Sequence, residues 1–461
     1  MKKESLFILS IVVGLTTSQA AVLTPSSESF CHASATGGET FALMRFPDNG
    51  MRKPCRQDAP STLPTKAELI KAGAAANDYW IATHSDPGNN LWARSVYNLG
   101  NIDFYKVHRE PKYLNYALKW AEANKWAVSG GPSTSNADNH TCGQTYYDLY
   151  KISGSRDEGK ILAVKAALDY RIANNPKSDD WWWIDAMFMA MPTFARLESE
   201  YGGGIYSEKL NALYRNTRDS LVVTSRKYLY PDEYRAKYGW GPIVRGYESR
   251  CGLYNKADHL WWRDWGFQPG VPPKKDPNNR MRTDVPKKSP GGKNIYWSRG
   301  NGWVLAAMAR TLQALPADDP HRADYVAVLK DMSAVLKDIQ REDGFWNMNL
   351  ADANHYPGPE TSGTALFTYA MAWGINNGIL DRATYQPVVA RAWHGLTTLA
   401  LEPSGRLTRV QDVGEGPIAP ARLNADVDFG VGAFLLAASE VAKLAEGEWP
   451  AVGGETALPA D

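Results

Sequence analysis

From Pro64 onward, apolar residues recur along the chain at the spacing of helices. The stretch "PTKAELIKAGAAANDYWIAT" shows this pattern after a Thr-Lys-Ala-Glu start, which is typical of a capping box. Few runs alternate between apolar and polar residues as strands do. The helical spacing predicts further helices near residues 92–107, 112–127, 143–153, 157–173, 183–200, 206–229, 303–315, 320–340, 362–378, 382–400 and 430–446.

About a dozen helices in one chain favour an all-α fold built as a toroid of helical hairpins, an (α/α)6 barrel. An irregular helical domain and a superhelical array are the alternatives, and the lack of a clean repeat of fixed period counts against the array. We expect the barrel to span residues 64–448, after an irregular lead-in over 21–63 and before a tail over 449–461. The long stretch 231–296 is too aromatic to be a disordered connector, and loops of this length are often functional.

The first 20 residues have the features of a secretory signal peptide. Lys2 and Lys3 precede an apolar run over residues 6–15, and small residues follow at 18–20. The apolar run is too short to span a bilayer, so we expect export to the periplasm or the medium and no membrane anchor.

Composition narrows the classes of partner. Charges nearly balance, at 51 basic and 50 acidic residues, which gives no reason to expect nucleic acid as a partner. An acidic ligand would therefore have to be held by local arginines. The 17 Trp and 23 Tyr are an unusually high content, and several of the Trp cluster with Gly, Arg and Asp, as they would around a sugar.

Four cysteines, Cys31, Cys55, Cys142 and Cys251, match no zinc motif, so no metal site is expected. In an exported protein a Cys31–Cys55 bridge would tie down the lead-in, although three pairings are open.

Two aspartates lie in settings suited to proton transfer. Asp185 follows three tryptophans in "DDWWWIDAMFMA", where burial would raise the pKa of its carboxyl group and prepare a general acid. Asp138 lies in a polar loop five residues before Gly143, where a helix begins, and a second carboxylate nearby would raise the pKa of Asp185 further. The structural alternatives are a helix cap for Asp185 and a turn residue for Asp138.

Two segments combine Trp with Arg. In "YWSRGNGWVLAAMARTL", the glycines would let the backbone approach a ligand, while the Arg pairs with a carboxylate and the rings stack on a sugar. The alternative is a Gly-rich turn plugged by Trp. "LWWRDWGFQP" repeats the mix of Trp, Arg and Asp, and Thr361 or Ser362 could cap a later helix. With no G-x-S-x-G elbow, P-loop or H-E-x-x-H, these segments favour acidic glycan chemistry.

The segments "WWWIDAMFMAMPTFARL", "WSRGNGWVLAAMARTLQALP", "DGFWNMNL", "ETSGTALFTYAMAWGINNGIL" and "FGVGAFLLAASEV" resemble glycoside hydrolase family 105, the unsaturated rhamnogalacturonyl hydrolases, over roughly residues 64–446. The resemblance implies an (α/α)6 barrel without metal or cofactor. It also implies substrates left by polysaccharide lyases, which carry a 4,5-unsaturated uronic acid at the non-reducing end. Members of this family hydrate the C4=C5 bond, and the unstable product then opens and releases the sugar.

Carried onto this chain, the resemblance makes Asp185 the catalytic acid, which protonates C4 and helps to activate water, with Asp138 as the second aspartate. Arg263 departs from the family, because many members have a His in this segment. An added cation there would favour a sulfated, ulvan-type substrate over a pectic one. The implied substrate-lining residues are Trp183, Trp297, Arg299, Trp303 and, as a looser match, Tyr97; of the preceding tryptophans, Trp181 and Trp182 are expected only to pack.

Two other functions fit the sequence. A polysaccharide lyase of the same fold would use a base such as His140, which lies near Asp138. A secreted glycan-binding protein would turn nothing over. In each case the expected partner is an acidic oligosaccharide, and the chain could be a monomer or a simple homo-oligomer.

Overall fold

The computed structural model describes residues 62–154, 157–175, 178–219, 252–269, 286–417 and 423–445. All of them belong to a unit that begins at Asp58. The expected signal peptide, most of the lead-in, the C-terminal tail and the Cys31–Cys55 pair lie outside these residues. Within the described ranges, no helix is both long and apolar enough to cross a membrane.

Twelve α-helices account for most of the described residues, and their positions follow the predicted ones closely. Two short antiparallel pairs are also present, β1 (Tyr254–Asn255) with β2 (Leu260–Trp261) and β3 (Val410–Gln411) with β4 (Leu423–Asn424). The helices are α1 (Lys66–Thr83), α2 (Trp92–Val107), α3 (Pro111–Ala123), α4 (Cys142–Ile152), α5 (Gly159–Asn174), α6 (Asp185–Tyr201), α7 (Ile205–Arg218), α9 (Ser298–Ala314), α10 (Arg322–Asp338), α11 (Thr361–Asn376), α12 (Arg382–Gly395) and α13 (Asp428–Ala445).

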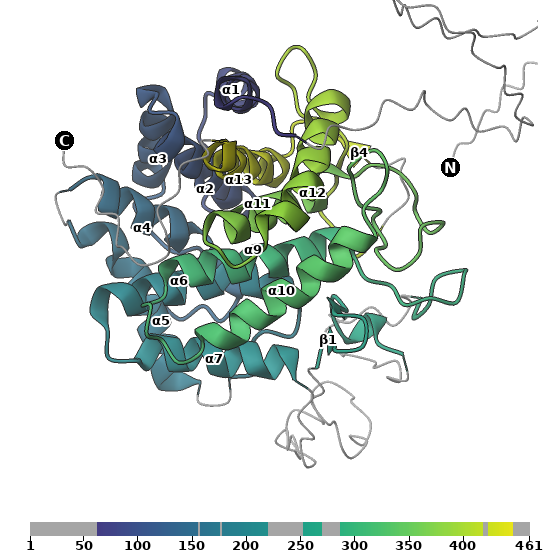
Figure 1. The fold of residues 1–461 in the computed structure, drawn as a ribbon. Coiled ribbons are helices and arrows are strands. Elements are labelled where there is room, and N and C mark those ends of the chain that lie inside the picture. The colour runs from purple at the N-terminus through teal and green to yellow at the C-terminus, as the bar shows by residue number, and fades with distance from the viewer. Residues whose placement is uncertain are drawn as a thin grey trace, which may run out of the picture. The chain divides into compact units, whose positions relative to one another are not determined.

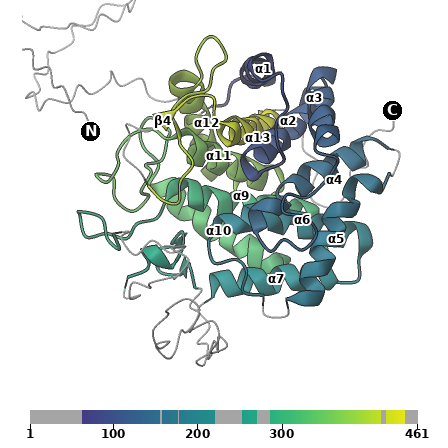
Figure 2. The ribbon, with the colours of Figure 1, turned by 180° about the vertical axis from the view of Figure 1, so that it is seen from behind.

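Six of these helices form a closed inner ring. The ring runs α2, α4, α6, α9, α11 and α13, and it closes because α13 packs on α2. Each inner helix also packs against an outer one, which pairs α2 with α3, α4 with α5, α6 with α7, α9 with α10, α11 with α12, and α13 with α1. Figures 1 and 2 show this second layer from opposite sides. This arrangement is the (α/α)6 barrel that the helical spacing predicted.

The inner helices run in the same direction, so that their N-termini gather at one end. The first turns of α2 and α13 are joined by the Arg94–Asp428 ion pair, and those of α9 and α11 by the close approach of Ser298 to Gly363. The inner helices are buried on nearly every side, and all 16 residues of α11 are buried. Since the N-terminal end of a helix carries partial positive charge, this end of the barrel is suited to an acidic ligand.

Two predictions concern the N-terminal caps of helices, one before α1 and one before α11. The capping box before α1 is confirmed, because the Thr65 hydroxyl accepts a hydrogen bond from Glu68 N at 3.3 Å and Thr65 N donates to the Glu68 carboxylate at 2.9 Å. The prediction that Thr361 or Ser362 caps α11 is wrong. Glu360 is the cap, since its carboxylate has two oxygens and accepts from the backbone of both Ser362 and Gly363.

The glycines of "RGNGW" serve helix packing and lie within the first two turns of α9, which begins five residues before Trp303. A Cβ atom at Gly300 would lie 2.9 Å from the Trp297 ring, and one at Gly302 would lie 3.0 Å from the Leu366 Cβ atom. The expectation that these glycines let the backbone approach a ligand is therefore wrong, because neighbouring helices occupy that space.

Candidate active site

A hollow of about 430 Å³ opens at the N-terminal end of the inner helices. Its walls come from the loop before α4, the segment before α6, the chain after β2, and the loop after β3. The lining residues are Ser135, Asn136, Asp138, Asp180, Trp182, Trp183, Arg263 and Glu415. Four segments that are far apart in sequence thus meet around the two predicted acids.

Asp185 is the first residue of α6 and lies beside this hollow, in contact with Arg263. Its Oδ2 atom accepts a hydrogen bond from Arg263 Nε at 3.3 Å, and only 8% of the residue is exposed. The residue before it, Ile184, takes the cap position without any side-chain capping bond, and its backbone N–H donates to the Arg263 carbonyl at 3.0 Å. The Asp185 carboxyl group is therefore not the helix cap.

The pKa of Asp185 is raised above its usual value because burial disfavours the charged carboxylate. Arg263 opposes this effect most strongly, and the Asp185 backbone N–H and Arg299 oppose it less. The direction agrees with the expectation from its place among the tryptophans.

Asp138 lies in a short 3₁₀ helix, Ala137–His140, which leads into α4. The Asn136 side chain accepts a hydrogen bond from the Asp138 backbone N–H at 3.0 Å and so fixes the start of this turn. Burial, followed by the charge of Asp185, raises the pKa of Asp138 to about 7, against a smaller lowering effect of Arg263. The charge of Asp185 therefore acts on Asp138, whose raised pKa lets it hold a proton near neutral pH.

Among the described residues that line this hollow, Arg263 is the only cation. It is 7% exposed, donates from Nη1 to Asp264 at 2.7 Å and from Nε to Asp185, and lies 5.6 Å from the centre of the Trp182 ring. Its charge is already opposed by two carboxylates. This geometry therefore gives no reason to assign Arg263 to a sulfate group rather than to the carboxylate of a uronic acid.

The three consecutive tryptophans have different environments. Trp181 is buried and meets Phe194 edge to face. Trp183 lines the hollow, where the sequence placed it, but so does Trp182, whose ring centre lies 4.7 Å from that of Trp183. The expectation that Trp182 only packs in the core is wrong. Residues 181–184 precede α6 and are not helical, so their side chains do not point in directions that helical spacing could predict.

Trp297 and Arg299 are buried behind the loop that follows β3. The Arg299 guanidinium lies 4.6 Å from the ring centres of both Trp297 and Phe429, and donates to the backbone carbonyls of Gln411 and Asp412 at 2.5 and 2.7 Å. Both residues are 1% exposed and neither lines the hollow. The structure therefore does not bring them to the position expected for substrate contact.

Trp303 and Tyr97 are also core residues. Trp303 packs on Phe188 and is 1% exposed, whereas the Tyr97 hydroxyl donates to Asn77 at 2.8 Å within a fully buried cluster. Trp92, the first residue of α2, is the partly buried aromatic residue at this end of the first hairpin, and its ring stacks on Phe429.

Asp180, Asn136, Ser135 and Glu415 line the hollow although sequence reasoning assigned them no place there. Asp180 is ion-paired with Arg171 of α5. Glu415 is brought in by the loop after β3, and no local pattern marks it, because its place depends on the contacts of that loop.

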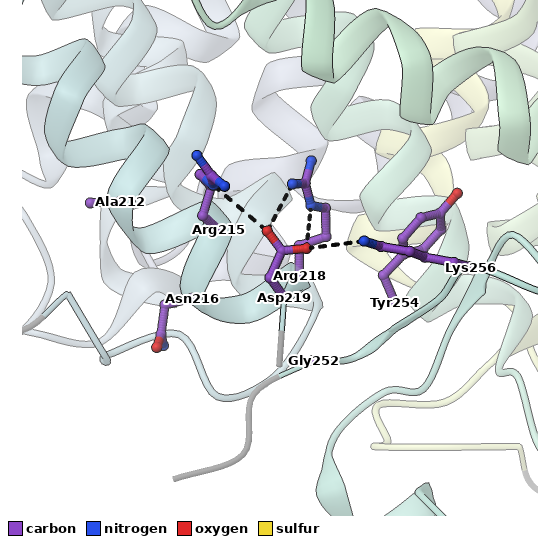
Figure 3. Close-up of a pocket in the computed structure, with 8 residues that line it drawn as sticks. All are labelled: Ala212, Arg215, Asn216, Arg218, Asp219, Gly252, Tyr254 and Lys256. Atoms are coloured by element: carbon purple, nitrogen blue, oxygen red, sulfur yellow. Dashed lines mark hydrogen bonds and ion pairs between the residues drawn. The ribbon is translucent and has the colours of Figure 1, made fainter. Parts of the chain in front are cut away.

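A second, larger hollow of about 650 Å³ lies between the end of α7 and the β1 segment (Figure 3). Its cations Arg215, Arg218 and Lys256 all converge on Asp219, at 3.6, 2.8 and 4.0 Å. None of the predicted site residues is among its described lining residues, and those residues include no pair of neighbouring carboxyl groups. The smaller hollow is therefore the candidate active site.

Comparison with known proteins identifies the family. The model described as Glycosyl Hydrolase Family 88 matches residues 71–445. The chain belongs to this family of glycoside hydrolases. The resemblance to the unsaturated rhamnogalacturonyl hydrolases of family 105 is also confirmed, because curated relatives named for this kind of activity match more than two thirds of the chain.

Three curated relatives carry related names. "Unsaturated 3S-rhamnoglycuronyl hydrolase" of Formosa agariphila is 36% identical, over 77% of this chain and 85% of the relative. A protein of the same name from an Alteromonas species is 28% identical, over 79% and 81% of the two chains. "Unsaturated rhamnogalacturonyl hydrolase YesR" of Bacillus subtilis is 30% identical, over 69% and 78%.

Solved structures share the fold. A family 88 glycosyl hydrolase from Bacteroides vulgatus is 31% identical with a TM-score of 0.67, over 83% of this chain and 100% of that one. A structure named "Polysaccharide Lyase BACCELL_00875" is 32% identical with the same TM-score, over 84% and 99%. A family 105 hydrolase from C. acetobutylicum is 18% identical with a TM-score of 0.61, over 80% and 99%, and supports the fold alone. The predicted (α/α)6 barrel is confirmed.

Proposed function

We propose that this glycoside hydrolase removes a 4,5-unsaturated uronic acid from the non-reducing end of lyase-generated oligosaccharides. The observation that carries this proposal is a hollow lined by Asp138, Arg263 and two tryptophans, with Asp185 beside it in contact with Arg263. Burial and the charge of Asp185 keep a proton on Asp138 near neutral pH, while the arginine and the rings are suited to an acidic sugar. The curated relatives carry names for activities of this class.

The reaction needs a proton at C4 and a hydroxyl group at C5. Asp185 gives its proton to C4 of the enol ether, water adds to C5, and the proton lost by that water returns to the carboxylate, so that no charge accumulates. Asp138, whose pKa is raised to about 7, keeps a proton within the pair. Arg263 faces the substrate carboxylate, and Trp182 and Trp183 provide ring faces for the sugar. The product of hydration is unstable, opens, and releases the next sugar.

A sulfated rhamnose next to the uronic acid is our preferred substrate, because two relatives carry the name 3S-rhamnoglycuronyl hydrolase. Turnover of unsaturated disaccharides from ulvan and from rhamnogalacturonan, followed as loss of absorbance at about 235 nm, tests this choice. We expect a higher kcat/KM for the sulfated ulvan disaccharide. A higher value for the rhamnogalacturonan disaccharide would leave the hydration intact and overturn only the sulfate preference.

The same absorbance separates the alternatives. It rises if a lyase creates the double bond, and it stays constant if the protein only binds glycans. One related structure is named a lyase, but His140, the base expected for that reaction, is 2% exposed and does not line the hollow. Burial also lowers the pKa of His140 to about 4. Hydration of the unsaturated sugar is therefore the function that the site supports best.

Export remains our proposal for localisation, on the basis of residues 1–20 alone. N-terminal sequencing of the protein recovered from periplasm and medium tests it. We expect a mature chain that starts near Ala21, and an intact Met1 on a cytoplasmic protein would contradict export.

A further inference from the structure

The chain just before α6 is fastened to an outer helix on both sides of Asp180. Lys209 of α7 is buried and donates from Nζ to Ser178 Oγ at 2.8 Å. Thr217, in the last turn of the same helix, donates from its hydroxyl group to the Trp181 carbonyl at 2.7 Å. Since buried hydrogen bonds hold the chain before and after it, the backbone at Asp180 has little freedom to move.

The Asp180 carboxylate is held through one of its two oxygens. Its Oδ2 atom accepts from Arg171 Nη2, in the last turn of α5, and from Asn175 Nδ2, in the residue that follows this helix. In the part of the chain that the structure describes, no hydrogen bond or ion pair reaches Oδ1. Asp180 lines the hollow with Asp138 and Arg263, and its side chain is 16% exposed. Oδ1 is therefore the carboxylate atom that a ligand in the hollow would meet.

The charge of Asp180 is offset from outside the hollow. Arg171 pairs with the carboxylate, and neither Arg171 nor Lys209 is among the described residues that line the hollow. Burial lowers the pKa of Lys209 and the charge of Asp180 opposes this effect, so the carboxylate also interacts with this second cation. An unopposed carboxylate would repel an acidic sugar, whereas this one presents an acceptor oxygen with its charge compensated.

An acceptor oxygen of this kind is suited to a sugar hydroxyl group. A carboxylate has no donor of its own, and hydrogen bonds to a charged acceptor are stronger than those to a neutral one. The hydration chemistry described above uses Asp185 and Asp138 and needs no third acid or base. Arg263 is suited to the substrate carboxylate, which leaves the hydroxyl groups of the sugar for Asp180.

We propose that Asp180 binds substrate by accepting a hydrogen bond from a sugar hydroxyl group at Oδ1, and that Arg171 is a positioning residue that holds this carboxylate and offsets its charge. This inference rests on the proposed function, because it assumes an acidic sugar in the hollow. It gives the outer helix α5 a role in substrate binding, although none of the described lining residues belongs to that helix.

Kinetics of Asp180→Ala and Asp180→Asn test the binding role with an unsaturated disaccharide, followed by the loss of absorbance of its double bond. We expect KM to rise about tenfold for Asp180→Ala, with kcat changed much less, because a hydrogen bond to a charged group is lost in the bound state. Asp180→Asn keeps a neutral acceptor oxygen and should raise KM less.

Asp343→Ala is the matched control. Asp343 forms an ion pair with Arg341 at 2.8 Å, its side chain is 26% exposed, and it is not among the described residues that line the hollow. The control therefore tests whether loss of a partly buried Arg–Asp pair elsewhere disturbs the kinetics. An unchanged KM in Asp180→Ala would overturn the proposal, and so would an equal rise in the control.

Binding measurements separate this inference from the proposed function. Calorimetric titration with the same disaccharide in an Asp185→Asn background should give a Kd about tenfold weaker once Asp180→Ala is added. Equal affinity with and without Asp180→Ala would contradict the role of Asp180 while hydration by the wild type still stands. If the wild type binds the disaccharide but leaves its double bond intact, the proposed function fails, and the same titration still decides on Asp180.

The positioning role predicts a recovery in the double variant. Arg171→Met keeps an apolar stem but removes the cation, so KM should rise more than in Asp180→Asn, because the carboxylate left behind repels the acidic substrate. Adding Asp180→Asn to Arg171→Met removes this charge and should lower KM again. A purely structural role of Arg171 would lower Tm without this recovery. A double variant with a higher KM than Arg171→Met would mean that Arg171 does not act through Asp180.

Discussion

At the scale of single residues, the site depends on one carboxyl pair and the cation beside it. Asp185 is buried at the start of α6 and in contact with Arg263, and Asp138 reaches the same hollow from another loop. Burial raises the pKa of both acids, and only Asp185 is in contact with the arginine. Their chemistry follows from these surroundings and would be absent in a solvated aspartate.

Asp185→Asn should abolish the loss of absorbance at 235 nm, with kcat reduced by about 10²–10⁴-fold, the usual value of general acid–base catalysis. The amide keeps the shape of the side chain and an acceptor for Arg263, so the circular dichroism spectrum and Tm should change little. Asp179→Asn is a control on the same segment, because Asp179 does not line the hollow. Near-normal turnover by the Asp185 variant would remove it from the reaction.

The stability of the protein should also depend on Asp138. Its pKa is about 7 in the folded state and 3.8 in the reference state, so between these values the folded protein holds a proton that the unfolded chain has lost. Stability from this group therefore falls as pH rises through that window. Between pH 5 and pH 8, the free energy of unfolding should therefore fall by about 1–3 kcal/mol less in Asp138→Asn than in the wild type. Urea unfolding at each pH measures this difference. An identical decline in both proteins would contradict the raised pKa.

At the scale of elements, helix starts bring the functional groups together. Glu360 illustrates this, because its carboxylate caps α11 and also accepts from Gln411 N, at the base of the loop that carries Glu415. Because Glu360 both caps α11 and binds the base of this loop, the stability of the helix and the position of the loop depend on the same carboxylate.

Glu360→Ala should therefore lower stability by about 2–4 kcal/mol, since several buried N–H groups lose their acceptor, and should raise KM at the same time. Glu360→Gln keeps an acceptor and should be milder in both respects. Chemical unfolding and disaccharide kinetics measure the two effects. A loss of stability with KM unchanged would separate the cap from the loop.

At the scale of the whole barrel, closure of the inner ring depends on two glycines. A Cβ atom at Gly100 of α2 would lie 2.2 Å from the Gly432 carbonyl oxygen of α13. The obstructing atom belongs to a helix backbone, which cannot move aside as a flexible side chain can. This contact joins α13, the last inner helix, to α2, the first, so the close packing that completes the ring depends on it.

Gly100→Ala should thus destabilise the protein by about 2 kcal/mol or more, although alanine favours a helix over glycine. Gly131→Ala is a poor control because its backbone has positive φ, whereas Gly159→Ala, at the start of the outer helix α5, meets only a flexible side chain. Thermal unfolding should show a much larger fall in Tm for Gly100→Ala. Equal falls in Tm for Gly100→Ala and Gly159→Ala would mean that the ring can close with a wider spacing between α2 and α13.

The sequence by itself determined the helices and the two acids. Helical spacing is a local property, set by contacts between residues three and four apart, and it placed twelve α-helices, from Lys66 to Ala445, close to where they lie. The barrel boundaries at 64 and 448 remain predictions. Asp138 and Asp185 were found from the polar loop and the tryptophan run that precede helix starts, whereas Trp183 and Arg263 came from the resemblance to family 105.

Only the tertiary structure decided which of these residues face the hollow. Trp297 and Arg299 have the composition of a sugar site, yet the loop after β3 covers them, and that loop is about 110 residues away in sequence. Glu415 enters the hollow for the same reason, with no local pattern to mark it. The physical cause is that burial depends on which distant segments pack together, whereas a sequence pattern records only the neighbours along the chain.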